Sequence, residues 1–433
     1  MLRGLGRNVI VLGLVSLLTD ISHEMLYPVV PLFLTTVLGA PMTVVGLIEG
    51  IAESTASLLK VASGWLSDRW RRRQPFLVAG YSLSALSKPL LALATSWHVV
   101  LVSRLLDRLG KGIRTGARDG LIAASCDPAH RGKAFGLHRA MDTVGAFFGP
   151  LIALLLLSQF HTPYRTVFLL AFVPAVAGVA ALSLVRDDPA PFEPEAQDRD
   201  QPRGRTLLPA GLWRLVFIFA VFAVGNSSDV FLLLRAKAVF LSRRPQDPQF
   251  AQTLMLMSYV LYNLVHALAA GPAGWLSDRL GRRRLIVSGF AVFAAVYLGF
   301  ALSPGPPMVW ALFALYGFYG AATEGVAKAQ VADLSPPETR ATAMGLLHTV
   351  TGLMAFAASV VAGLLWTRFG SSAPFVYGAC CAGLAAALFL VVGPRPAPSG
   401  ACMSDPSAAR GGAPGAQSSS PRRRHPTSRA ATT

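Results

Sequence analysis

The chain has 433 residues, of which 53% are hydrophobic and only 14% are charged, and its formal net charge is +17 at pH 7. Because soluble globular proteins carry about a quarter charged residues, this composition excludes an ordinary soluble domain. The four cysteines have neither the spacing of metal ligands nor that of a disulfide framework, so the sequence predicts no metal site.

Apolar runs long enough to cross a bilayer, which takes roughly 20 residues, recur along the chain. We predict twelve membrane helices, six on either side of a polar stretch that starts at Arg186. They begin near Asn8, Val44, Pro75, His98, Ala134, Arg165, Gly211, Thr253, Leu285, Pro307, Ala341 and Ala373. The first run starts with basic residues, as a signal peptide does, but it continues past Pro31 without a small-residue cleavage site and is therefore a membrane helix.

This pattern predicts an all-α integral membrane protein with two bundles of six helices, over residues 1–185 and 210–393. Residues 186–209 between them are rich in Asp, Glu, Pro and Arg, which is typical of a solvated linker. Residues 394–433 contain mainly Pro, Ser, Ala and Arg without periodicity, so we predict a disordered tail.

Ionisable residues inside membrane helices cost several kcal/mol each, so every one is a candidate for function. The first, second and fifth helices carry such residues on one face, namely Asp20, His23, Glu24 and Tyr27, then Glu49 and Glu53, then His138 and Asp142 with Arg139 alongside. The second half has fewer of them, so we expect it to supply mainly apolar and aromatic wall.

A hairpin between two apolar runs occurs twice. Residues 64–73 read Gly-Trp-Leu-Ser-Asp-Arg-Trp-Arg-Arg-Arg, and residues 274–283 read Gly-Trp-Leu-Ser-Asp-Arg-Leu-Gly-Arg-Arg. A membrane carrier built from two homologous halves accounts for this repeat, because its halves rock about a shared site at the midplane.

The fourth helix carries a basic stripe. At about 100° per residue, its basic residues fall on one face, namely Arg104, Arg108, Lys111, Arg114 and Arg118. The first five helices hold seven acidic and eight basic residues within the membrane, and this near balance predicts a buried ion-pair network. We expect Arg114 and Arg118 to be structural and Arg108 to have an acidic partner at Glu24, Glu49 or Asp142.

The repeated hairpin resembles the signature of the major facilitator superfamily, and the resemblance covers residues 8–393. Gly136, Gly145, Gly149 and Pro150 resemble the fifth-helix motif of its drug/proton antiporter branch, although Ala153 and Leu154 stand where that motif has two small residues. The proline pair Pro28 and Pro31 is similar to that of twelve-helix exporters. Residues 108–112 resemble the fourth-helix Arg motif, with Lys111 where the family often has Gln.

The resemblance implies the major facilitator fold and a gating latch between its halves. The latch residues would be Gly64, Asp68 and Arg69 in the first copy and Gly274, Asp278 and Arg279 in the second. The glycines permit close helix approach, and each Asp can accept backbone N–H groups at a neighbouring helix start. Arg71 replaces the usual Gly of the first copy.

The distribution of basic residues predicts the orientation of the chain in a bacterial inner membrane. Outside the spans and before the tail, eighteen Lys and Arg lie on the side of the termini and four on the other side. By the positive-inside rule, both termini and the linker are cytoplasmic.

The carboxylates of the first half are the candidates for proton coupling, because a proton-driven carrier needs a group that is protonated or ionised as a basic partner leaves or arrives. We rank Glu24, Asp20 and Asp142 above Glu49 and Glu53. Arg104 and Arg108 would be their switching partners. The substrate cavity would also contain Arg139, Tyr27, His23 and His138, and either histidine could relay a proton.

Together these features predict a secondary transporter that moves a small organic solute by alternating access, as a proton-coupled exporter. One alternative is proton-coupled import of an organic anion, and another is a non-transporting membrane scaffold or receptor. We predict no enzyme and no cofactor, since Gly110-Lys111-Gly112 lacks the flanking residues of a phosphate loop. The expected partners are the solute, protons and the lipid bilayer, without nucleic acid, and the chain is expected to act as a monomer.

Overall fold

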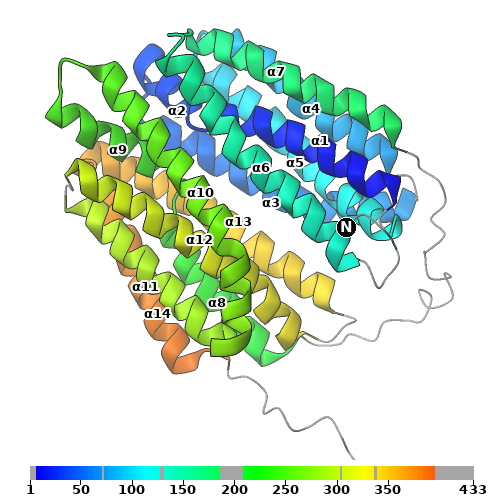
Figure 1. Ribbon diagram of the computed structural model, residues 1–433. Coiled ribbons are helices and arrows are strands. Elements are labelled where there is room, and N and C mark those ends of the chain that lie inside the picture. The colour runs from blue at the N-terminus through cyan, green and yellow to red at the C-terminus, as the bar shows by residue number, and fades with distance from the viewer. Residues whose placement is uncertain are drawn as a thin grey trace, which may run out of the picture. The chain divides into compact units, whose positions relative to one another are not determined.

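The computed structural model describes residues 6–70, 73–126, 131–185, 208–302, 305–335 and 339–394, and within these ranges every regular element is a helix (Figure 1). The described part excludes the side chains of residues 60–70, 123–124, 131–132, 274, 278 and 340–341. Most of the predicted linker, residues 186–207, and nearly all of the predicted tail, residues 395–433, also lie outside it.

The N-terminal bundle contains six spans. The first span is α1 (Arg7–Leu26) with α2 (Val30–Leu32) and the π-helical η1 (Phe33–Val37), and the others are α3 (Met42–Trp70), α4 (Gln74–Ala92), α5 (Trp97–Ala124), α6 (Arg131–Ser158) and α7 (Tyr164–Ala181) with η3 (Leu182–Leu184). Within this bundle α1 packs against α6 and α7, and α5 packs against α3 and α4.

The C-terminal bundle repeats this plan. Its first span is broken into α8 (Ala210–Gly225) and α9 (Val230–Arg243), and the others are α10 (Pro248–Leu280), α11 (Arg282–Ala301), α12 (Pro306–Leu334), α13 (Arg340–Phe369) and α14 (Ala373–Val392). The predicted helix starts agree with these bounds, and the largest difference is at Thr253, which is the sixth residue of α10. The all-helical fold with two six-helix bundles is confirmed.

Nine of the described helical segments are long and apolar enough to cross a membrane by length and composition. The spans formed by α4, α5 and α12 are not among them. The helix α5 carries the basic stripe, and its charges are compensated inside the N-terminal bundle, as described below. Its basic side chains face the neighbouring helices, since those of Arg104, Arg108 and Arg114 are at most 5% exposed, and charges in a membrane span are expected to face the bundle interior.

The two bundles contact each other through α3 with α13 and through α6 with α10. We call the end at which α1 and α8 begin the terminal end, and the opposite end, at which α3 and α10 begin, the far end. Near the far end a Cβ added at Gly46 would lie 2.2 Å from the carbonyl oxygen of Ser359. There the Tyr164 hydroxyl also donates to the Gln252 side chain at 2.6 Å. The bundles are thus tightly packed at the far end.

Candidate functional site

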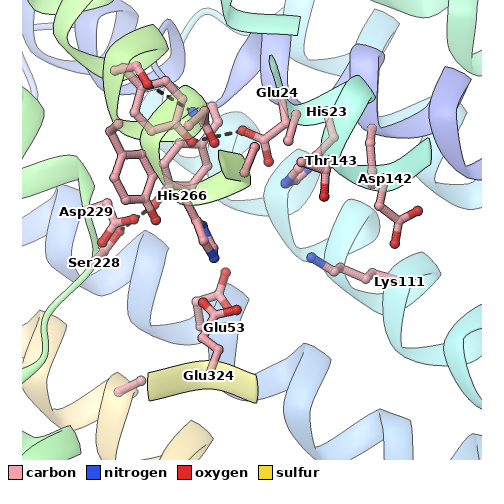
Figure 2. A pocket seen from close by; sticks show the side chains of 18 of the residues that line it. His23, Glu24, Glu53, Lys111, Asp142, Thr143, Ser228, Asp229, His266 and Glu324 are labelled. Atoms are coloured by element: carbon pink, nitrogen blue, oxygen red, sulfur yellow. Dashed lines mark hydrogen bonds between the residues drawn. The ribbon is translucent and has the colours of Figure 1, made fainter. Parts of the chain in front are cut away.

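A cavity of about 510 Å³ lies between the two bundles. Its walls come from α1, α3, α5 and α6 on the N-terminal side, and from α10, α12, α13 and the break between α8 and α9 on the C-terminal side (Figure 2). This volume is within the range of roughly 300–1,000 Å³ that is usual for small-molecule sites.

The break between α8 and α9 supplies one polar wall. Four consecutive residues line the cavity there, namely Asn226, Ser227, Ser228 and Asp229. The Tyr316 hydroxyl donates to Asp229 Oδ1 at 2.7 Å, and the Ser228 backbone N–H donates to Ser359 Oγ at 3.2 Å. In membrane proteins, irregular backbone within a span is tolerated where it lines a cavity. Breaks of this kind form the ligand sites of many transporters. The sequence prediction missed this site, although a polar run inside an apolar span signalled it.

Five tyrosines form a continuous row beside the break. The centroids of successive rings are 5.7 Å apart for Tyr27 and Tyr259, 5.7 Å for Tyr259 and Tyr262, 5.3 Å for Tyr262 and Tyr316, and 5.3 Å for Tyr316 and Tyr319. We call these residues the tyrosine row. The Tyr259 hydroxyl donates to Glu24 Oε2 at 2.8 Å, so the row joins α1 of the first bundle to α10 and α12 of the second.

Two ion pairs form side by side between α5 and α3. Arg104 donates to both oxygens of Glu49, at 2.8 and 3.0 Å, and Arg108 pairs with Glu53 at 2.8 Å. The expected partners of Arg108, which were Glu24, Glu49 or Asp142, are therefore wrong. The reason is the register of the two helices. The arginines and the glutamates are each four residues apart, so when Arg104 faces Glu49, the next turn of α5 faces the next turn of α3.

A buried chain of polar contacts continues from Arg108 into the bundle. Lys88 Nζ lies 2.7 Å from Asp107 Oδ1, and His23 Nδ1 lies 3.1 Å from Asp107 Oδ2. His23 Nε2 lies 3.2 Å from Arg108 Nη1. Because a guanidinium can only donate, Nε2 must accept and Nδ1 must carry the proton that is donated to Asp107. The contacts therefore define His23 as the neutral Nδ1–H tautomer.

The glycines of the predicted fifth membrane helix, which is α6 in the structure, pack against the α1 carboxylates. A Cβ at Gly145 would lie 2.9 Å from the Cβ of Asp20, and one at Gly149 would lie 2.7 Å from the Cβ of Glu24. Gly145 and Gly149 thus let α6 pack directly on the face of α1 that carries both acids. Gly136 has no atom within 4 Å of such a Cβ and takes no part in this contact, and Pro150 lies inside α6.

Substitution of these glycines tests the packing. We expect Gly149→Ala to destabilise the protein by about 1–3 kcal/mol, because the added methyl group overpacks the contact between α6 and α1. The matched variant Gly136→Ala should be neutral or stabilising by up to about 1 kcal/mol, since Ala is the better helix former. Thermal unfolding of both purified variants in detergent checks this, and a melting temperature for Gly149→Ala equal to that of Gly136→Ala would contradict the packing described.

The N-terminal wall of the cavity also contains Asp20, and it contains Lys111 and Asp142, which are labelled in Figure 2. His138 Nδ1 lies 3.5 Å from Asp142 Oδ2, in line with their predicted common face. Arg139 lies 3.6 Å from Glu324 across the cavity, but both side chains are more than half exposed, at 65% and 56%. An exposed pair of this kind contributes about 0–1 kcal/mol, so it is a weak contact between the bundles.

The remaining stripe residues contact groups outside the cavity. The Arg114 guanidinium lies 4.4 Å from the centroid of the Tyr81 ring, and Arg118 Nε lies 3.0 Å from Asp119 Oδ1. Neither residue lines the cavity described above. Their structural role remains a prediction.

The predicted latch falls largely outside the described side chains. This applies to Gly64, Asp68 and Arg69 near the end of α3, and to Gly274 and Asp278 near the end of α10. The Arg279 guanidinium lies 3.9 Å from the Trp275 ring centroid. Gly281, which joins α10 to α11, has a φ of 86°, in the left-handed region that favours glycine.

Acidic residues outnumber basic ones in the cavity wall. The acids are Asp20, Glu24, Glu53, Asp142, Asp229 and Glu324, and the bases are Arg108, Lys111 and Arg139, with His23 and His266 in addition. Asp229, Glu324 and His266 belong to the second bundle. The sequence places these three among the few ionisable residues of the second half without choosing them as site residues, and here they line the cavity beside the tyrosine row.

Comparison with known proteins agrees with this architecture. The sequence profile of the Major Facilitator Superfamily matches residues 12–242 and 245–407. An uncharacterized MFS-type transporter of Methanocaldococcus jannaschii is 37% identical over 390 residues, which cover 90% of this chain and 96% of that protein. An uncharacterized protein of Mycobacterium tuberculosis is 29% identical over 366 residues, covering 83% of this chain and 87% of that protein.

Among solved structures, a bacterial homologue of the human lysosomal transporter Spinster, in an inward-facing and occupied conformation, has a TM-score of 0.70. It is 18% identical, and the match covers 88% of this chain and 95% of that chain, so it supports the fold. The profile match and the archaeal relative establish more. The chain belongs to the major facilitator superfamily, and it is a membrane transport protein rather than an enzyme.

Proposed function

We propose that this protein is a proton-coupled exporter of a small organic solute in the bacterial cytoplasmic membrane, related to the drug/proton antiporters and acting as a monomer. The observation that carries the proposal is the acid-rich cavity between the bundles. Asp20 and Glu24 line it without an ion pair to any described Lys or Arg side chain. Half-buried carboxylates that lie within a membrane span and lack a fixed basic partner are suited to bind and release protons.

The packing of the bundles supports alternating access. Near the far end the bundles are in close contact, at Gly46 with Ser359 and at Tyr164 with Gln252. With both termini in the cytoplasm, as the basic residues predict, the far end faces outward. The cavity is then positioned to receive solute from the cytoplasm, and the latch residues Asp68 and Asp278 would fasten the terminal end in the opposite state.

Glu53 is the carboxylate that best links the cavity to the buried network. Its side chain is 42% exposed, whereas that of its partner Arg108 is 2% exposed. A proton that binds to Glu53 from the cavity neutralises the carboxylate and leaves the buried guanidinium without its counter-charge. Arg108 would then interact more favourably with another carboxylate than with the neutral Glu53. Its movement toward that carboxylate would couple protonation to the position of α5 against α3.

Neutralisation of Glu24 tests proton coupling in the cavity. Glu24→Gln keeps an acceptor for the Tyr259 hydroxyl but cannot carry a proton, so we expect it to abolish gradient-driven flux while exchange of solute across the membrane continues. The measurement uses proteoliposomes and a solute found by its ability to dissipate an imposed pH gradient. Glu24→Asp is the control and should keep part of the driven flux. Loss of exchange together with driven flux in Glu24→Gln would instead make Glu24 a solute ligand.

A further inference from the structure

We propose that the C-terminal wall of the cavity binds a monovalent organic cation, with its charged group between the Asp229 carboxylate and the tyrosine row. This inference rests on the proposed function, because it takes the cavity as the transport site and adds the chemical class of the solute. It is carried by four features of the wall, which are its charge, its aromatic rings, an unpartnered hydroxyl and the position of Asp229 at a helix start.

The first feature is the charge that remains after pairing. Arg108 is paired with Glu53 and Arg139 with Glu324, so the two arginines of the cavity are already balanced. Lys111 is then the remaining basic residue of the wall, opposed by four carboxylates, namely Asp20, Glu24, Asp142 and Asp229. In a site of low dielectric an anionic solute would meet net repulsion, and a cation would supply the missing charge.

The second feature is the tyrosine row. Tyr27, Tyr259 and Tyr262 line the cavity directly, and a cation over such a ring is attracted to its electron-rich face. The row already accepts a cation from the protein, since the Arg104 guanidinium lies 5.9 Å from the centroid of the Tyr27 ring. The rings also provide apolar surface for the body of an organic solute, which a purely acidic cavity would lack.

The third feature is Ser227, which lines the same wall. Its side chain is only 5% exposed, and its hydroxyl lies near the Tyr297 hydroxyl but forms no well-aligned hydrogen bond within the described part of the chain. A buried polar group without a partner costs about 1–3 kcal/mol, so such a group beside a ligand cavity indicates a contact that forms with the ligand. Its oxygen can accept from an ammonium group or face the positive end of a quaternary one.

The fourth feature is the location of Asp229 at the N-cap of α9, which has 14 residues. A helix start favours negative charge and is a common place for an anionic ligand. The Asp229 side chain forms no capping hydrogen bond with the first N–H groups of α9, and one of its oxygens accepts from the Tyr316 hydroxyl. The positive end of the helix dipole lies beside Asp229, and a bound cation would further favour the ionised carboxylate.

Binding of a matched pair of ions tests the charge preference. Tetraphenylphosphonium and tetraphenylborate have nearly the same shape and opposite charge. Calorimetry of each with the purified full chain in detergent, corrected against empty micelles, therefore measures how binding depends on the sign of the ligand's charge. A second pair tests a smaller ligand, and it consists of choline and its neutral isostere 3,3-dimethylbutan-1-ol. We expect saturable binding of at least one of the two cations, and binding at least tenfold weaker for its anionic or neutral counterpart.

Variants then place the site. Asp229→Asn should weaken cation binding at least tenfold and Asp229→Glu should restore part of it, whereas Asp247→Asn, an exposed acid at the start of α10, should leave binding unchanged. Tyr262→Leu should weaken binding about tenfold and Tyr262→Phe far less, because Phe keeps the aromatic face. If Asp229→Asn does not fold, as judged by thermal unfolding, the two Tyr262 variants decide the question.

The outcomes separate this inference from the proposed function. Binding is measured without a gradient, so cation binding that depends on Asp229 upholds the inference even if no pH-driven flux is found. Failure of both cations to bind, or binding that is equal for the anion or unaffected by Asp229 and Tyr262, overturns the inference. Proton-driven flux of a neutral or anionic solute would then leave the proposed function standing.

Discussion

Replacing Arg108 with alanine is expected to destabilise the protein by about 1–3 kcal/mol, because it removes the donor to the buried His23 Nε2 and a counter-charge of Glu53, whose 42% exposure lets water offset part of the loss. The double variant Arg108→Ala/Glu53→Gln should recover most of this loss, since it leaves no unpaired charge. It should nevertheless fail to couple flux to a pH gradient, because the switch between Glu53 and Arg108 is gone. Thermal unfolding and gradient-driven flux, measured on the same purified protein, check both parts.

The control for this experiment is the pair of Arg118 and Asp119, whose side chains are 16% and 45% exposed. The double variant Arg118→Ala/Asp119→Asn should change stability by about 1 kcal/mol or less and should keep coupled flux. Full coupling in the Arg108 and Glu53 double variant would refute the switching role and assign this pair to structure alone.

Replacing Asp107 with alanine is also expected to lower the stability of the protein strongly. Lys88 is 1% exposed and lies 2.7 Å from Asp107, so the variant leaves a buried ammonium group without its counter-ion, at a cost of about 3–5 kcal/mol. The double variant Lys88→Met/Asp107→Leu should recover part of this loss, because apolar groups of similar volume replace the pair, but His23 and Ser84 lose their acceptor, which costs about 1–3 kcal/mol each. Thermal unfolding in detergent measures both changes.

An exposed pair again provides the comparison. Arg282 and Asp333 lie 2.7 Å apart with side chains 26% and 51% exposed, and Asp333→Ala should lower stability by about 1 kcal/mol or less. A wild-type melting temperature for Asp107→Ala would mean that Lys88 does not depend on this carboxylate. It would contradict a stabilising role for the buried polar contacts from Lys88 to Arg108.

The sequence predicts the helices of this protein well and the partners of its charges poorly. Membrane helices satisfy their own backbone hydrogen bonds, so hydropathy alone gives starts close to those observed. The partner of Arg108 depends on the rotation and register of α5 against α3, which no local pattern encodes. Asp107 was not chosen as a site residue because its contacts with Lys88 and His23 come from two other helices, α4 and α1.

The cavity wall of the second bundle left a signal that the sequence prediction did not use. Tyr259 and Tyr262 in α10, and Tyr316 and Tyr319 in α12, are each three residues apart and so lie on one face of their helix. The polar residues 226–229 interrupt an otherwise apolar span. Each pattern is a weak signal alone. In the structure α10 and α12 pack together, so their tyrosines lie beside the break and the two patterns belong to one site.

Solute uptake into proteoliposomes under an imposed pH gradient shows whether the acid-rich cavity couples solute export to protons. An antiporter takes up solute when the lumen is acidic, because protons leave as solute enters. We therefore predict that an acidic lumen drives uptake above the level without a gradient, that an alkaline lumen does not, and that Glu24→Gln abolishes the difference. Uptake driven by an alkaline lumen, or equal under all three conditions, would contradict the claim.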